Sequence, residues 1–256
     1  MPVRKAAARA LMSTLCAALL LAACTKTPPL PPITGAAGPP GQRDAAPHDR
    51  PAPLRTPSSA DRIPGVGPLT RARVPDGTGQ ALVVVGETAD TNRATAVLYE
   101  RDERKQWRRV AGPWSAHNAL RGWTTHHVAD DLRTPIGVFR IGDAGGRLPD
   151  PGTLLPYDQD EEFALDGTGF AGEPLEGSFD YVIAIDYNRV PGTTPLNKKR
   201  PLGLGRGGGV WIHVDHGGPT QACVSLPREV MPRLLRALDP RKEPVVVMGP
   251  KADIAR

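Results

Sequence analysis

The chain has 256 residues, enough for one domain of ordinary size with additional terminal segments. Its formal net charge is +5, but residues 1–23 carry three cations and no acidic residue, so the rest of the chain carries only +2. Acidic and basic residues are interleaved without a long basic block, and this distribution argues against a nucleic-acid partner.

The N-terminus has the pattern of an export signal. Its three cations precede an apolar run over residues 10–23, and this run is too short to span a bilayer of about 30 Å as a helix. The run ends in Leu-Ala-Ala-Cys, which resembles the lipobox of bacterial lipoproteins. We therefore predict a signal peptide over 1–23 and a lipid on Cys24, which anchors the exported protein to the outer face of the bacterial cell membrane, facing the cell wall. A secretory peptide cleaved nearby without lipidation is the alternative.

Residues 24–64 are predicted to form a tether. Ten of the 29 prolines lie between Pro28 and Pro57, and no apolar period accompanies them. Such a segment is expected to be disordered with polyproline II character. At about 3.1 Å per residue it reaches up to roughly 100 Å from the lipid anchor.

Residues 65–250 are predicted to form one domain, with 251–256 as a tail. The β-rich runs are 81–86, 94–101, 106–112, 134–142, 180–188, 209–215 and 243–249. Short polar connectors join the first three runs, which predicts an antiparallel meander. The run 180–188 is apolar on both faces at its centre, so we expect it to be buried.

One segment, 227–240, has the spacing of a helix, since Met231, Leu234 and Leu235 fall on one face. Pro232 is expected to break or kink this helix. Many short strands with one or two short helices predict a mainly-β, β-sandwich-like domain.

The cysteine count makes Cys223 unusual. The chain has three cysteines, Cys16, Cys24 and Cys223. Because Cys16 leaves with the signal and Cys24 carries the lipid, one free thiol remains in a compartment where disulfides are the norm. A leftover cysteine of this kind indicates intermolecular pairing or a reactive role.

A histidine on the preceding strand suggests what that role is. Alternation along 209–215 places His213 on the face opposite the apolar residues, and Cys223 and Ser225 share one face of the next strand. A tight glycine- and proline-containing loop between the strands is expected to bring His213 and Cys223 to one rim. An imidazole there takes the thiol proton and later returns a proton to a leaving amine. Main-chain N–H groups around Ala222 can bind the developing oxyanion.

These residues resemble a known family. The stretch "IHVDHGGPTQACVSL" (212–226) is similar to the active-site signature of L,D-transpeptidases with the YkuD-type catalytic domain, and "RTPIGVFRI" (133–141) is similar to that family's Thr-Pro-x-Gly-x-Phe strand. The resemblance covers about residues 75–250. It implies the fold of that catalytic domain, peptidoglycan stem peptides as substrate, a thioester on the cysteine and a 3→3 cross-link as product. If water replaces the acceptor amine, the activity is that of an L,D-carboxypeptidase.

The resemblance also implies chemistry that needs no metal or organic cofactor and susceptibility to carbapenems. We expect the protein to be a monomer. Position by position, Cys223 matches the nucleophile, His213 the proton donor and acceptor, and Thr220 the residue that braces the loop. Two positions depart from the pattern. Ala222 replaces a glycine, which is costly if the backbone there is left-handed, and Gln221 replaces a histidine found in many members.

Further residues near the cysteine are candidates for support of the substrate or of the oxyanion. This set contains Thr220, Gln221, Ala222, Ser225 and His216, the last of which we interpret as an exposed loop residue.

Four further interpretations concern other parts of the sequence or the function as a whole. A zinc site has the right ligand types but lacks paired Cys-x-x-Cys or His-Glu-x-x-His spacing; its candidates are His213, Asp215, His216 and Cys223. "GLGRGG" (203–208) precedes a strand, so we predict a flexible loop, with a gate as the lesser alternative, and no nucleotide site. His126 and His127 are expected to be solvated loop residues. A non-catalytic wall-binding lipoprotein, with Ala222 marking a decayed site, is the alternative to an enzyme.

Overall fold

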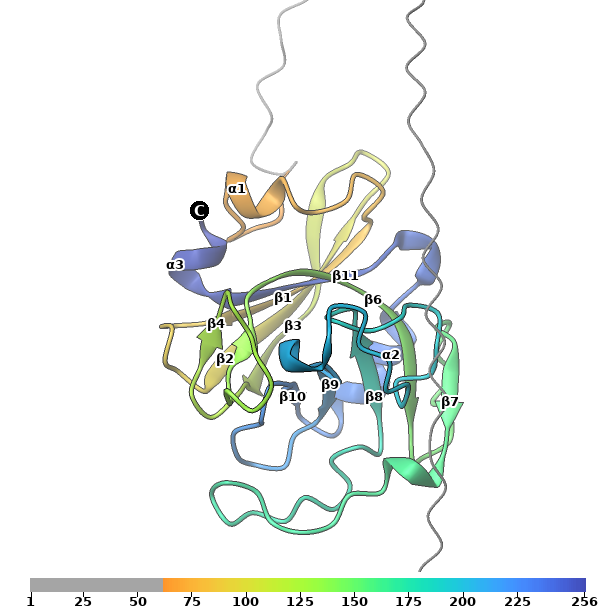
Figure 1. Ribbon diagram of the computed structural model, residues 1–256. Coiled ribbons are helices and arrows are strands. Elements are labelled where there is room, and N and C mark those ends of the chain that lie inside the picture. Colours follow the sequence, from red (N-terminus) through yellow and green to blue (C-terminus); the bar gives the residue numbers. More distant parts are fainter. Residues whose placement is uncertain (1–61) are drawn as a thin grey trace, which may run out of the picture. The chain divides into compact units, whose positions relative to one another are not determined.

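The computed structural model describes residues 62–256, which form a mainly-β domain with few helices (Figure 1). The strands are β1 (Gln80–Gly86), β2 (Arg93–Arg101), β3 (Trp107–His117), β4 (Trp123–Thr124), β5 (Thr134–Pro135), β6 (Gly137–Gly146), β7 (Tyr157–Gln159), β8 (Val182–Ile185), β9 (Trp211–Val214), β10 (Val224–Leu226) and β11 (Val245–Pro250). The helices are α1 (Pro68–Arg71), α2 (Val230–Ala237) and α3 (Lys251–Ile254), and the 3-10 turns are η2 (Glu161–Phe163), η3 (Leu204–Arg206) and η4 (Pro240–Lys242). In this part of the chain no helix is long and apolar enough to cross a membrane. The predicted signal peptide, Cys24 and nearly all of the tether lie outside the described residues.

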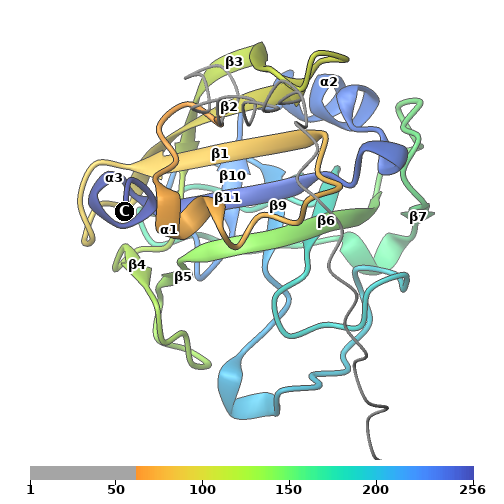
Figure 2. The same cartoon turned by 90° about the horizontal axis from the view of Figure 1, so that it is seen from above.

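Nine strands form one sheet that closes on itself. Their order is β11-β1-β2-β3-β10-β9-β8-β6-β7, and β11 also pairs with β6. Figure 2 shows β11 between β1, its parallel partner, and β6, its antiparallel partner. The mainly-β prediction is confirmed, but the sandwich was wrong. Because β11 is hydrogen-bonded along both edges, the sheet is barrel-like instead of two stacked layers, and β7 extends it beyond β6.

The predicted meander is confirmed by antiparallel pairing of β1 with β2 and of β2 with β3. Both faces of β1 are buried. Leu82 and Val84 belong to the main core, whereas Ala81 and Val83 belong to a second apolar cluster that includes Ile254 of α3. The predicted tail therefore takes part in the fold, because α3 covers the outer face of β1 and β11.

The helix α2 runs without a break from Val230 to Ala237, so the predicted kink at Pro232 was wrong. Pro232 is the third residue of the helix, and main-chain N–H groups of the first turn have no partner within a helix. A missing N–H at that position therefore removes no helical hydrogen bond. Leu234 and Leu235 are fully buried against the main core, as their spacing predicted.

The strand β8 is buried along its whole length, as predicted, but it ends at Ile185. Beyond it the chain turns at Asn188, which has a φ of 44°. Arg189 is then held by ion pairs to Asp143 at 2.7 Å and to Asp186 at 2.5 Å. This buried cluster fixes the start of the long connection from β8 to β9, which forms part of the pocket wall.

Candidate active site

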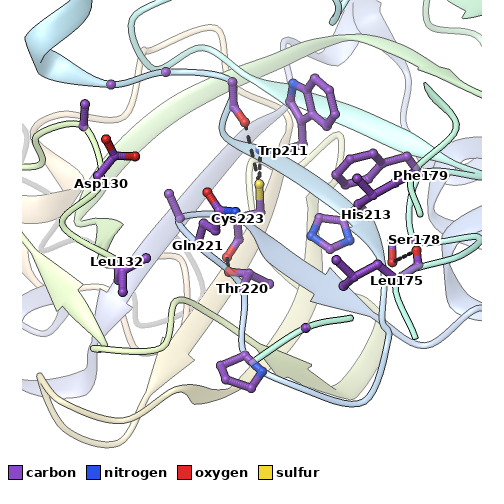
Figure 3. Close-up of a pocket in the computed structure, with 18 of the residues that line it drawn as sticks. Asp130, Leu132, Leu175, Ser178, Phe179, Trp211, His213, Thr220, Gln221 and Cys223 are labelled. Carbon is purple, nitrogen blue, oxygen red and sulfur yellow. Dashed lines mark hydrogen bonds between the residues drawn. The ribbon is translucent and has the colours of Figure 1, made fainter. Parts of the chain in front are cut away.

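Cys223 and His213 line one pocket of about 710 Å³ (Figure 3). Its wall comes from four segments, 127–132, 165–179, 195–213 and 216–223. The strands β9 and β10 are parallel, with Ser225 opposite His213. The loop between them is therefore not a tight turn, because it must run back along the pocket from the end of β9 to the start of β10. Cys223, just before β10, thus lies at the end of the sheet where β9 begins.

The thiol of Cys223 is bound to the backbone of the neighbouring segment. Its sulfur accepts a hydrogen bond from the Trp211 main-chain N–H at 3.3 Å and donates to the Gly209 carbonyl at 3.7 Å. Burial raises the pKa of the thiol from 9.0 to about 11, and the Trp211 N–H offsets only part of this effect. The resting group is thus a half-buried, protonated thiol.

His213 is a neutral imidazole with its tautomer fixed. The residue is 3% exposed, and its Nδ1 donates to the Val214 carbonyl at 2.9 Å. Nε2 is therefore the nitrogen left to accept a proton. Burial lowers the pKa of His213 from 6.5 to about 4, and the neighbouring His216 adds to this effect, whereas the main-chain carbonyls of Val214 and Ser178 act in the opposite direction. Among the hydrogen bonds of residues 62–256, none joins His213 to the sulfur of Cys223.

His216 is not an exposed loop residue, contrary to the prediction. Its side chain is 6% exposed, and its Nδ1 donates to Glu173 Oε1 at 3.0 Å. The ring stacks on His213 with a centroid separation of 5.8 Å and an interplanar angle of 6°. Phe179 packs edge-on against His213, with 5.2 Å between ring centroids. The candidate base is therefore held between rings supplied by two loops.

Two threonines hold the main chain of the cysteine. Thr220 Oγ1 donates to the Cys223 carbonyl at 2.7 Å, which agrees with the bracing position predicted for it. Thr134 Oγ1 donates to the same carbonyl at 3.4 Å and accepts from the Ala119 N–H at 2.9 Å. Thr134 was expected only as part of the strand motif at 133–141, so its contact with the cysteine main chain was not predicted, although its place in that motif was a usable signal.

The departure at Ala222 is compatible with the site. Ala222 is not among the residues with positive φ, so its Cβ causes no left-handed strain. Its side chain packs against the main core, while Gln221 is exposed at the pocket rim. Within residues 62–256 the main-chain N–H groups of Ala222 and Cys223 donate to no protein acceptor. They are the N–H pair that the sequence predicted for an oxyanion.

Ser225 does not reach the pocket, contrary to its inclusion among the supporting residues. It is fully buried and donates to Asp215 Oδ1 at 2.8 Å, and His117 Nδ1 lies 2.9 Å from the same oxygen. Burial would raise the pKa of Asp215, but the bonds from His117 and Ser225 outweigh it and lower the pKa to about 2. This carboxylate therefore links β9, β10 and β3 behind the site. Nowhere in the described part of the chain do three His, Cys, Asp or Glu side chains gather in a way that could hold a metal ion.

The glycine-rich segment beside the thiol is fastened at several points. Asn188 Nδ2 donates to the carbonyls of Gly203 at 2.9 Å and Gly207 at 2.6 Å. The single hydroxyl proton of Tyr187 is shared between the carbonyl oxygens of His127 at 3.1 Å and Arg206 at 3.0 Å. These hydrogen bonds anchor the segment at Gly203, Arg206 and Gly207, and its flexibility stays a prediction.

The prediction that His127 is a solvated loop residue was also wrong. Its side chain is 4% exposed, packs edge-on against Tyr187 and has its Nδ1 2.9 Å from Asp131 Oδ1.

In comparison with known proteins, no family model, no curated protein and no solved structure matched this chain.

Proposed function

We propose that the protein is a cysteine-dependent L,D-transpeptidase that acts on peptidoglycan stem peptides. The observation that carries the proposal is the shared pocket of a free thiol, a neutral imidazole whose Nδ1 is held by a main-chain carbonyl, and two unpaired main-chain N–H groups. These are the three components that acyl transfer through a thioester requires. The signature around Cys223 supplies the substrate class.

In the first step of the proposed reaction, Nε2 of His213 takes the proton from Cys223 as the sulfur attacks the peptide carbonyl carbon. The carbon–nitrogen bond breaks, and the proton passes from His213 to the leaving amine. In the second step an acceptor amine attacks the thioester and gives its proton to His213. The carbon–sulfur bond then breaks, and the proton returns to the sulfur, so one peptide bond replaces another without a redox change.

The raised pKa of the thiol and the lowered pKa of the imidazole favour a neutral resting pair. Proton transfer to His213 therefore belongs to the chemical step, after substrate has excluded water from the pocket. Hydrogen bonds in a catalytic pair often shorten only when substrate is bound. This accounts for a sulfur that bonds to the main chain of Trp211 and Gly209 and not to His213.

The β domain is proposed to be the catalytic domain of this enzyme class. It is exported as a lipoprotein anchored through Cys24 and acts as a monomer without a cofactor. Hydrolysis of the thioester by water gives an L,D-carboxypeptidase on the same substrate. The high pKa of the Cys223 thiol favours the other candidate, a non-catalytic wall-binding lipoprotein.

The test is turnover of a disaccharide tetrapeptide with and without an amine acceptor, followed by mass spectrometry of the peptide and of the protein. We expect loss of the terminal residue, a transient adduct on the protein and a cross-linked product, all absent in Cys223→Ala. Release of a tripeptide without cross-links identifies the carboxypeptidase. Binding of the tetrapeptide with no adduct and no product contradicts the enzyme and supports the binding module.

A further inference from the structure

Arg200 contributes an incompletely bonded cation to the pocket wall. Its Nη1 donates to the main-chain oxygens of Asn197 at 2.8 Å and Lys199 at 3.0 Å. Across residues 62–256, Nε and Nη2 of Arg200 donate to no acceptor, and no carboxylate lies within ion-pair distance of the guanidinium. Part of its hydrogen-bonding capacity is thus unused.

The surroundings of Arg200 make this state unfavourable without a further partner. The side chain is half-buried, and burial lowers its pKa, with the nearby Arg189 adding to the effect. Arg189 itself is buried but is neutralised by Asp143 and Asp186. A partly desolvated charge without a counter-ion is costly, so the guanidinium is suited to an anion that comes from outside the chain.

Two glycines place this cation beside the nucleophile. The carbonyl of Gly209 accepts the hydrogen bond from the Cys223 thiol at 3.7 Å. A Cβ built on Gly209 would lie 3.2 Å from Arg200 Nη2, and one on Gly208 would collide with Nε. Because Gly208 and Gly209 have no side chain, the guanidinium can pack against the same backbone segment that contacts the Cys223 sulfur.

We propose that Arg200 binds the free carboxylate of the leaving residue, so that the site selects peptides that end one residue after the bond attacked by Cys223. This inference rests on the proposed function and deepens it. One residue of extended peptide spans about 3.5 Å, so the terminal carboxylate of such a peptide lies next to the scissile carbonyl.

The charge of the pocket suits this ligand. Two N–H groups on one edge of a guanidinium match the two oxygens of a carboxylate. Lys198 adds a second cation to the lining, against one carboxylate from Asp130. An amidated or longer peptide brings no charge to this position and is a poor substrate.

The test compares a stem tetrapeptide acid with its C-terminal amide as acyl donors, using the purified full chain. For the wild type we expect kcat/KM for the acid to exceed that for the amide by about 10- to 100-fold, the value of one charged hydrogen-bonded pair. Arg200→Gln removes this preference by slowing the acid alone. The control Lys199→Gln, which removes an exposed neighbouring cation outside the lining, keeps it.

Equal rates for acid and amide in the wild type, or equal slowing of both in Arg200→Gln, would overturn the proposal. If neither peptide acylates the protein, the proposed function fails and the subsite is judged by binding to Cys223→Ala. Tighter binding of the acid that Arg200→Gln abolishes supports the subsite, and equal dissociation constants for acid and amide reject it.

Discussion

The buried neutral state of His213 predicts a specific acid sensitivity of the fold. The pKa of His213 is about 4 in the folded protein and 6.5 when exposed. Below pH 6.5 the unfolded chain therefore binds a proton that the folded chain does not, so stability is unaffected above pH 6.5 and falls as the pH decreases towards 4. The shift corresponds to a loss of about 3 kcal/mol in the free energy of unfolding at pH 4.

Urea unfolding between pH 8 and pH 4 measures this loss, with His213→Gln as the comparison. The variant lacks the titrating group and is expected to lose about 3 kcal/mol less over the same interval, whatever its stability at pH 8. Asp215, with a pKa of about 2, affects both proteins equally in this range. An identical pH dependence in wild type and variant would refute the assignment of a buried neutral imidazole.

Three further predictions concern the residues around the thiol. Alkylation of Cys223 by iodoacetamide should keep rising about tenfold per pH unit beyond pH 9, because its pKa is about 11, and a plateau near pH 9 would contradict this. Thr134→Val should lower the unfolding free energy by about 1–3 kcal/mol and slow acylation, because it leaves the Ala119 N–H unpaired; unchanged melting and acylation would refute the contact. Ala222→Gly should leave the acylation rate within a few-fold and cost about 0.5–1 kcal/mol through backbone entropy, whereas a large gain in rate would show that the Cβ obstructs the site.

The sequence predicted most strands, because alternation and buried apolar runs are local signals. It also predicted that Cys223 and His213 lie at one rim, because alternation along each strand indicates on which face a side chain lies. Closure of the sheet was not predictable in this way. The pairing of β11 with β6 joins segments about a hundred positions apart along the chain. Neither strand has a local sequence pattern that indicates which strand it pairs with.

The same limit explains the errors at the site. His216 and His127 lie in polar stretches, and their burial depends on Glu173 and Tyr187, which come from other loops. Ser225 follows the alternation of its strand, but its hydroxyl donates a hydrogen bond to Asp215 behind the pocket instead of facing the pocket. The sequence around Arg200 gives no indication of its role. That role depends on the absence of a carboxylate partner among residues 62–256, which only the folded structure shows.

The most direct test of the central claim is the rate at which a carbapenem acylates the protein, followed by intact mass. We expect one adduct on the wild type, no adduct on Cys223→Ala, and a much slower reaction on His213→Ala, in which the thiol is still present. An adduct that forms as fast without His213 would show that the imidazole is not the base. A wild-type thiol that reacts with iodoacetamide but never with the carbapenem would contradict acyl transfer itself.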